Sequence, residues 1–108
     1  VGYIQPDVAR AGGISEVKKI AVLASAFNIP YCPHTGASGA VCVAASLHLA
    51  AAMPNFLIFE FMYPPNPLRE DILIESLPQV KEGFIRIPDK PGLGIELDEE
   101  KIARFRKD

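Results

Sequence analysis

Short apolar runs alternate with longer stretches of helical periodicity between Val1 and Glu60. The runs over 2–5, 29–33 and 56–59 have the length of strands and are bounded by proline or polar residues, which predicts three short buried strands. Between them, apolar side chains recur at helical spacing over 14–27, and nearly every face of 39–53 is apolar. The pattern therefore predicts an α/β arrangement, strand–helix–strand–helix–strand, in which right-handed crossovers join parallel strands.

The pattern changes beyond Met62, where prolines and turns replace the regular alternation. Two polar residues are placed to cap helices, Asn28 after the first predicted helix and Asp98 before the last one. This tail does not continue the alternation of strands and helices, so we expect it to pack on a neighbouring domain. In chain order we predict an extended crossing over 63–67, an irregular stretch or short helix over 69–77, short strands over 83–87 and 94–97, and a closing helix over 99–106.

A sheet of three parallel strands would leave two bare edges, which is unusual for a complete protein. A slice of an eight-stranded (β/α)8 barrel resolves this, because neighbouring units would cover both edges. The sequence also opens at Val1 in what reads as the middle of a strand. We therefore expect the carboxyl-terminal part of a longer protein, with a portion of a barrel over 1–78 and a carboxyl-terminal segment over 79–108 that packs on a neighbouring domain.

An ionisable residue follows each predicted strand: Asp7, His34 and Glu60. The interval from Asp7 to His34 is nearly equal to the interval from His34 to Glu60, and parallel neighbouring strands would bring these side chains to one face of the sheet. A carboxylate beside a histidine fixes its tautomer and favours the imidazolium, which suits a general base. A second acid could donate a proton or a hydrogen bond if burial kept it protonated. A divalent-metal site and three unrelated loop residues remain alternatives.

Composition narrows the class of partner. The chain carries 11 Lys and Arg against 13 Asp and Glu, a net charge of −2, without a basic cluster for nucleic acid. No apolar run reaches the roughly 18 residues that a membrane span needs. Cys32 and Cys42 fit no zinc spacing, and we expect both to be reduced in a cytoplasmic protein.

Several further residues could carry chemistry, but a structural role is favoured for each. Ser38 lacks the Gly-x-Ser-x-Gly motif that surrounds a nucleophilic serine. The loop 35–39 could bind an anion through its backbone N–H groups, although a plain tight turn is favoured. Arg10 is expected in a structural salt bridge, while His48 and Cys32 are expected to pack in the core.

Four stretches of the sequence carry a resemblance to a known family: Gln5–Glu16, Ala26–Pro30, Pro33–His34 and Pro91–Ile95. The Asp-x-x-Arg-x-Gly-Gly pattern that begins at Asp7, followed by a histidine at the spacing of His34, is fairly specific, and Pro-Gly-Leu-Gly-Ile supports it independently. Together they resemble the carboxyl-terminal part of the enolase superfamily. The branch they resemble is that of mandelate racemase and the acid-sugar dehydratases.

This resemblance implies a (β/α)8-type barrel with a capping domain, of which this chain would hold strands six to eight and a tail returning to the cap. His34 would be the general base, Asp7 the acid that pairs with it, and Glu60 the acid that hydrogen-bonds the enolate. The cofactor implied is Mg²⁺, which stabilises the enediolate. Its acidic ligands would end upstream strands, so the resemblance assigns neither metal ligands nor cofactor-binding residues to this chain.

The activity expected from the resemblance is dehydration of an acid sugar, a small-molecule carboxylate. His34 would remove the proton α to the carboxylate and, as imidazolium, help to expel the β-hydroxyl as water. One alternative is a racemase or epimerase of a 2-hydroxy acid, which needs a second base from upstream. Another is an inactive fragment or interaction module without the metal half of the site. We also expect a homo-oligomer, and the glycine-rich loop 35–39 leaves the substrate open.

Overall fold

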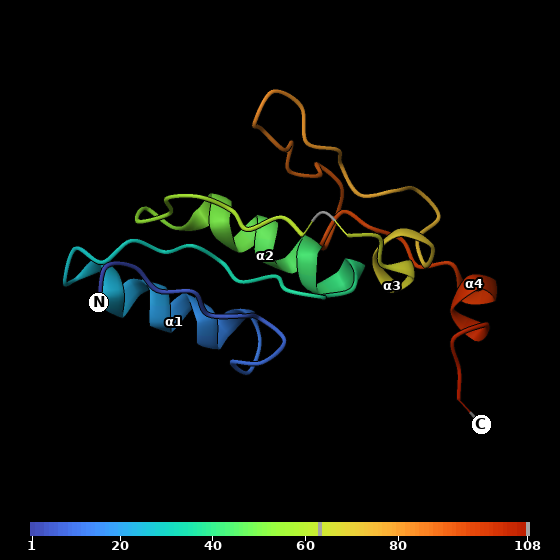
Figure 1. Ribbon diagram of the computed structural model, residues 1–108, viewed down its shortest axis with the longest axis horizontal. Coiled ribbons are helices and arrows are strands. Elements are labelled where there is room, and N and C mark those ends of the chain that lie inside the picture. The colour runs from blue at the N-terminus through green and yellow to red at the C-terminus, as the bar shows by residue number, and fades with distance from the viewer. Residues whose placement is uncertain (63, 108) are drawn as a thin grey trace.

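The computed structural model describes residues 1–62 and 64–107. This part of the chain contains four helices: α1 (Ile14–Ser25), α2 (Ala40–Ala52), α3 (Pro67–Glu70) and α4 (Glu99–Ala103). α1 and α2 lie side by side, α3 lies beside the first residues of α2, and α4 is close to the C-terminus (Figure 1). The predicted extended crossing begins at Tyr63, which lies outside the described residues.

α1 forms because its apolar residues recur on one face of a helix. Its buried side chains lie four and then three residues apart: Val17, Ala21 and Ala24. The helix is followed by Asn28 in a left-handed conformation, with a φ of 53°. The Ile29 N–H then donates to the carbonyl of Ala24 over 3.0 Å, as in a Schellman motif. The predicted C-cap at Asn28 is therefore confirmed, although regular helix ends sooner than predicted, at Ser25.

α2 is buried over most of its circumference, as its apolar composition predicted. Its buried residues are Ala40, Val43, Ala44, Ala45, Ser46, Leu47, Leu49 and Ala50. They divide between two hydrophobic clusters, one shared with Tyr31 and α1 and the other shared with Leu73 and Leu77 of the tail. α2 therefore joins the amino-terminal part of the chain to its tail.

The three extended segments that were predicted as strands pair in parallel, with Tyr31 in the middle. Tyr31 forms one parallel bridge to Ile4 and another to Phe56. The Ile4 N–H donates to the carbonyl of Pro30, and its carbonyl accepts from the Cys32 N–H, each over 2.9 Å. The parallel order of the three segments is therefore confirmed.

The prediction of regular strands over 2–5, 29–33 and 56–59 is wrong in the described residues, where each bridge stands alone. Prolines explain this, because a proline has no N–H to donate. Beyond the bridge between Ile4 and Tyr31, the next N–H donor of the first segment would be that of Pro6. Beyond the bridge between Tyr31 and Phe56, the next N–H donor of the middle segment would be that of Pro33. The chain therefore stays extended but cannot add the next hydrogen bond.

The tail forms its own short contacts. Leu73 and Leu97 form an antiparallel bridge, so the predicted strand over 94–97 is reduced to one bridged position. The prediction of a strand over 83–87 is wrong: a tight turn links Lys81 to Phe84. The turn forms because its two central residues, Glu82 and Gly83, have φ values of 51° and 81°, the left-handed pair of a type I′ turn.

The closing helix is shorter than the predicted 99–106, since α4 ends at Ala103. Its predicted N-cap is confirmed, because the Asp98 side chain accepts a hydrogen bond from the Lys101 N–H over 3.0 Å.

Residues on both sides of the predicted boundary at 78/79 share the second cluster. Leu77 is buried there, and Ile85, Leu93 and Ile95 pack against it. The imidazole Nε2 of His48 lies 2.9 Å from the carbonyl oxygen of Leu93, so the expected satisfied ring is confirmed, although His48 is half-buried rather than in the core. The tail thus packs partly on α2, and its contact with a capping domain stays a prediction.

Candidate active site

Asp7 lies at the end of the first extended segment and organises the turn that follows. Its Oδ1 accepts hydrogen bonds from the backbone N–H groups of Ala9, over 2.8 Å, and Arg10, over 3.2 Å. This is the local hydrogen bonding for which aspartate is favoured at turns. The residue is only 7% exposed, and its second oxygen, Oδ2, remains free to face another side chain.

The surroundings of Asp7 keep its carboxyl group ionised. Burial raises the pKa of Asp7, but the hydrogen bond with His34 and those from the Ala9 and Arg10 N–H groups outweigh it, so the pKa lies below its usual 3.8. Burial has the dominant effect on Tyr31, where it raises the pKa to about 12, with a further contribution from Cys42. At neutral pH the Tyr31 side chain is therefore a neutral phenol, and the Asp7 side chain is a charged carboxylate.

His34 lies beside Asp7 because its own segment is hydrogen-bonded to the first one. The His34 N–H donates to the carbonyl of Pro6 over 3.3 Å, and Nδ1 of the ring lies 3.0 Å from Oδ2 of Asp7. An ionised carboxylate can only accept, so Nδ1 carries the proton in this pair. In the neutral ring the lone pair is therefore on Nε2, which is the arrangement of a general base.

Glu60 lies on the opposite side of the imidazole. Its Oε2 is 3.8 Å from Nε2 of His34, and it accepts from the N–H groups of Thr35, over 3.0 Å, and Gly36, over 3.5 Å. The Thr35 hydroxyl also donates to the backbone carbonyl of Glu60. The sequence argument required burial to keep this acid protonated, but the side chain is 37% exposed. Because Oε2 is occupied as an acceptor, any proton on this carboxyl group would be on Oε1.

Gly36 packs directly against the imidazole ring of His34. Its φ is +42°, in the left-handed region that favours glycine, and a Cβ there would lie 2.6 Å from Cε1 of His34. Any other residue at this position would collide with the ring or move the backbone. The glycine in the loop after His34 therefore has a steric reason that the sequence pattern did not reveal.

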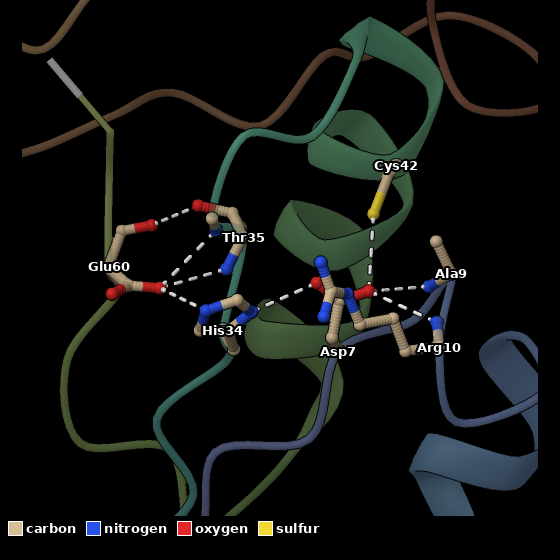
Figure 2. Close-up of polar contacts among 8 residues, drawn as sticks. Asp7, Ala9, Arg10, His34, Thr35, Cys42 and Glu60 are labelled. Carbon is tan, nitrogen blue, oxygen red and sulfur yellow. Dashed lines mark hydrogen bonds and ion pairs between the residues drawn. The ribbon is translucent and has the colours of Figure 1, made fainter. Parts of the chain in front are cut away.

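Figure 2 shows the resulting order, with His34 between Asp7 and Glu60. The structure thus brings together the three residues that followed the three predicted strands. Each comes from a different segment, and the parallel bridges through Tyr31 hold these segments in register. The arrangement can accept a proton at Nε2, because the imidazolium formed there would lie beside the ionised carboxylate of Asp7.

The structure also places the residues for which the sequence favoured a structural role. The side chain of Arg10 is exposed and forms no ion pair with the residues described, so the expected salt bridge is wrong and only its backbone N–H contacts Asp7. Cys32 is buried, as expected, and both cysteines are free thiols. The loop over 35–39, called the site loop below, does hold an anionic group through its N–H groups, but that group is Glu60.

Sequence reasoning named the loop 35–39 as a possible anion binder but did not link Thr35 and Gly36 to Glu60, and it missed Cys42. The Thr35 and Gly36 N–H groups hold Glu60, and the thiol of Cys42 on α2 lies 3.9 Å from Oδ1 of Asp7 (Figure 2). The position of Thr35 and Gly36 directly after His34 was an available signal. Cys42 had none, because only the packing of α2 places it there.

The described residues were also compared with the requirements of a metal site. Within 1–62 and 64–107, no group of three or more His, Cys, Asp or Glu side chains could hold a metal ion. Asp7 and His34 are bonded to each other, so they do not offer a common set of free donor atoms. Likewise, none of the helices in these residues is long and apolar enough to cross a membrane.

Comparison with known proteins identifies the family. The family model described as enolase C-terminal domain-like matches residues 1–101. The chain belongs to the enolase superfamily. Its relatives are enzymes of the mandelate racemase branch and acid-sugar dehydratases, as the four stretches of the sequence indicated.

Two curated relatives show what this chain is similar to. It is 40% identical over 114 residues to the D-galactarolactone cycloisomerase of Agrobacterium fabrum, which covers 98% of this chain and 30% of the relative. It is 39% identical over 102 residues to the D-xylonate dehydratase of Haloferax volcanii, covering 94% of this chain and 24% of the relative. The chain therefore spans less than a third of the length of these enzymes.

The fold agrees with solved structures of the same family. The crystal structure of a mandelate racemase/muconate lactonizing enzyme from Jannaschia sp. CCS1 matches with a TM-score of 0.86 and 40% identity, over 100% of this chain and 27% of that one. The chain thus has the α/β fold of the enolase superfamily, and its relatives act on small carboxylates or acid sugars.

Proposed function

We propose that this chain supplies the proton-transferring part of a Mg²⁺-dependent acid-sugar dehydratase. The observation that carries the proposal is the bond between Nδ1 of His34 and Oδ2 of Asp7, which leaves Nε2 free as a base. Membership of a superfamily whose relatives include D-xylonate dehydratase supports this reaction class.

The reaction begins when Nε2 of His34 removes the proton α to the substrate carboxylate. The C–H electron pair passes into the carboxylate, which becomes an enediolate, and Asp7 stabilises the imidazolium that forms. The imidazolium then returns this proton to the β-hydroxyl as the C–O bond breaks. Water leaves with the electron pair of that bond, and the enol product becomes a 2-keto-3-deoxy acid. His34 ends as it began, so the cycle is complete.

Glu60 has a separate role on the other side of the imidazole. Oε2 is held by the Thr35 and Gly36 N–H groups, so Oε1 is the oxygen that can contact substrate. A proton on Oε1 would donate a hydrogen bond to the developing enediolate. The fixed N–H groups keep the carboxyl group from rotating away during this step.

Mg²⁺ is generally used by members of the superfamily. It would act as a Lewis acid toward the substrate carboxylate. Since Asp7, His34 and Glu60 do not fit as its ligands, we place the ligands in other parts of the full-length protein. In the same way we place residues 1–78 in a (β/α)8 barrel, as strands six to eight, and residues 79–108 against a capping domain. The 108-residue segment alone is then expected to be inactive.

A second candidate is isomerisation of an acid-sugar lactone, favoured by the 40% identity to D-galactarolactone cycloisomerase. Both reactions can start with the same proton abstraction and differ in the group that leaves, water or the ring carboxylate. A racemase would instead need a base on the opposite face of the substrate, supplied from outside this chain.

The test uses the protein at its natural length, with Mg²⁺, against a library of sugar acids and their lactones. His34→Asn should lower α-proton exchange in deuterated water by about 10²- to 10⁴-fold, because the base is lost. His48→Asn is the matched control, since His48 bonds to Leu93 and lies outside the trio. Exchange retained by His34→Asn would contradict the proposal. Substrate and mass balance distinguish the two candidates: dehydration turns a sugar acid into a keto-deoxy acid that has lost one water, whereas isomerisation turns a lactone into a ring-opened product of equal mass.

A further inference from the structure

A residue of the tail holds the site loop from the outside. Asn66 stands directly before α3, and its Nδ2 donates to the carbonyls of Ala37, over 2.9 Å, and Ser38, over 3.3 Å. Its Oδ1 accepts from the Leu68 N–H over 3.0 Å and so caps α3. One side chain therefore joins elements that are 29 and 28 residues apart in sequence.

The site loop is fixed at both of its ends. At one end the Thr35 and Gly36 N–H groups hold Glu60. At the other end α3 is so close that a Cβ on Gly39 would lie 3.0 Å from the carbonyl oxygen of Leu68. Asn66 binds the carbonyls of Ala37 and Ser38, which lie between these two contacts. A change of the backbone angles there would turn the Gly36 N–H away from Glu60.

We infer that Asn66 is a positioning residue for the site. By holding two carbonyls of the site loop, it keeps the N–H groups of Thr35 and Gly36 on Glu60 and keeps Gly36 flat against His34. The hydrogen-bond partners of the Asn66 side chain in the described residues are Ala37, Ser38 and Leu68, so its bonds reach the site through the loop. The consequence for catalysis rests on the proposed function, whereas the effect on the loop does not.

The decisive variant is Asn66→Asp, because aspartate keeps the oxygen that caps α3 and replaces the Nδ2 donor with a charged oxygen that repels the two loop carbonyls. The readout is amide hydrogen exchange at Thr35 and Gly36 in the protein at its natural length, without substrate. Two lost hydrogen bonds should accelerate exchange there by about tenfold or more, relative to the amide of Leu47 in α2. Asn66→Ser, which keeps a capping oxygen but cannot reach both carbonyls, should show the same change.

Asn55 provides a matched control at the opposite end of the segments. Its Nδ2 also donates to two carbonyls, those of Ala21 and Ile29, each over 3.0 Å. Asn55→Asp removes the same number of bonds and should destabilise the protein while leaving Thr35 and Gly36 unchanged relative to Leu47. Equal acceleration in both variants would mean general loosening and would overturn the inference, as would an unchanged rate in Asn66→Asp.

Activity gives the second readout. In Asn66→Asp we expect kcat to fall about tenfold while KM changes little, because the base and the acid are misaligned but the binding groups are not. If kcat stays unchanged although the loop amides exchange faster, Asn66 does not position the site for catalysis. If His34→Asn keeps its α-proton exchange, the proposed function fails, and the amide rates still decide whether Asn66 holds the loop.

Discussion

The long helices and the short helices of this chain are stabilised in different ways. α1 and α2 have 12 and 13 residues and begin after Gly13 and Gly39, which provide no side-chain cap. α3 and α4 have only four and five residues, and the side chains of Asn66 and Asp98 cap them. The long helices are held by burial, whereas the short ones depend on a local hydrogen bond.

The polar contacts of the amino-terminal part and those of the tail also differ in how deeply they are buried. The pair of Asp7 and His34 is embedded between three segments, and Asp7 is almost fully buried. In the tail, the ion pair of Lys90 with Glu75 is 2.6 Å long, but its side chains are 60% and 76% exposed. An exposed pair of this kind contributes little to stability. Charge is thus buried beside a histidine in the first region and exposed to solvent in the second.

The largest effect on stability is expected from the core of α2. Leu47 is 1% exposed, so Leu47→Ala should lower the free energy of unfolding by about 2–5 kcal/mol, through lost transfer energy and a cavity. Leu68→Ala on α3 is the control, since Leu68 is 48% exposed and should cost at most about 0.5–1 kcal/mol. Urea unfolding of both variants tests this, and equal losses would contradict the division between packed and capped helices.

A smaller effect, present at neutral pH and lost in acid, is expected from Asp7. Its pKa is lowered in the folded state, so its ionised form stabilises the fold above the usual value of 3.8. That contribution is lost as the pH falls through the lower folded pKa. Asp7→Asn, which can still accept from the turn N–H groups, should therefore be less stable than the parent near pH 7 and approach it below pH 3.8.

Urea unfolding between neutral and acid pH measures the difference in stability between Asp7→Asn and the parent protein. Glu75 is the comparison from the tail, because the hydrogen bond and charge of Lys90 lower its pKa at an exposed position. In about 1 M salt, where the Debye length is about 3 Å, the pKa of Glu75 should return toward its usual value while that of Asp7 stays low. Equal salt sensitivity of the two carboxylates would show that burial does not distinguish them.

The smallest of these effects is expected at the cap of α4. Asp98→Ala removes the acceptor for the Lys101 N–H and should cost about 1 kcal/mol. Asp98→Asn keeps an acceptor oxygen and should recover most of that loss. Amide exchange at Lys101 reports the fraying of α4 directly, while the amides of Thr35 and Gly36 should not respond. A response there would show that the tail acts on the site through α4 as well as through Asn66.

The site was largely predictable because it depends on period and topology. The intervals between Asp7, His34 and Glu60 match one repeat of strand and helix, so parallel pairing had to bring their side chains to one edge. The roles of these residues in catalysis stay predictions. The contacts around them were less accessible, since Cys42 reaches Asp7 only through the packing of a helix that is apolar on nearly every face.

The fold was predictable where local signals were strong. The helical periodicity gave α1 and α2 to within a few residues, and Asn28 and Asp98 acted as the expected caps. The strands were overestimated, because apolar runs do not show that Pro6 and Pro33 occupy the donor positions of a ladder. The extended crossing predicted over 63–67 overlooked the helix that begins at Pro67 after its cap Asn66, and nothing in the sequence linked the Asn66 amide to a loop 28 residues away.

The close approach of Gly36 to His34 has a consequence for sorting genome sequences of this family. With the imidazole in the observed position, only a glycine leaves room for Cε1 of the ring. A homologous chain that keeps the histidine but carries a larger residue two positions later must hold that ring differently. A histidine followed two positions later by glycine thus distinguishes homologues whose imidazole can lie as it does here from homologues whose imidazole cannot.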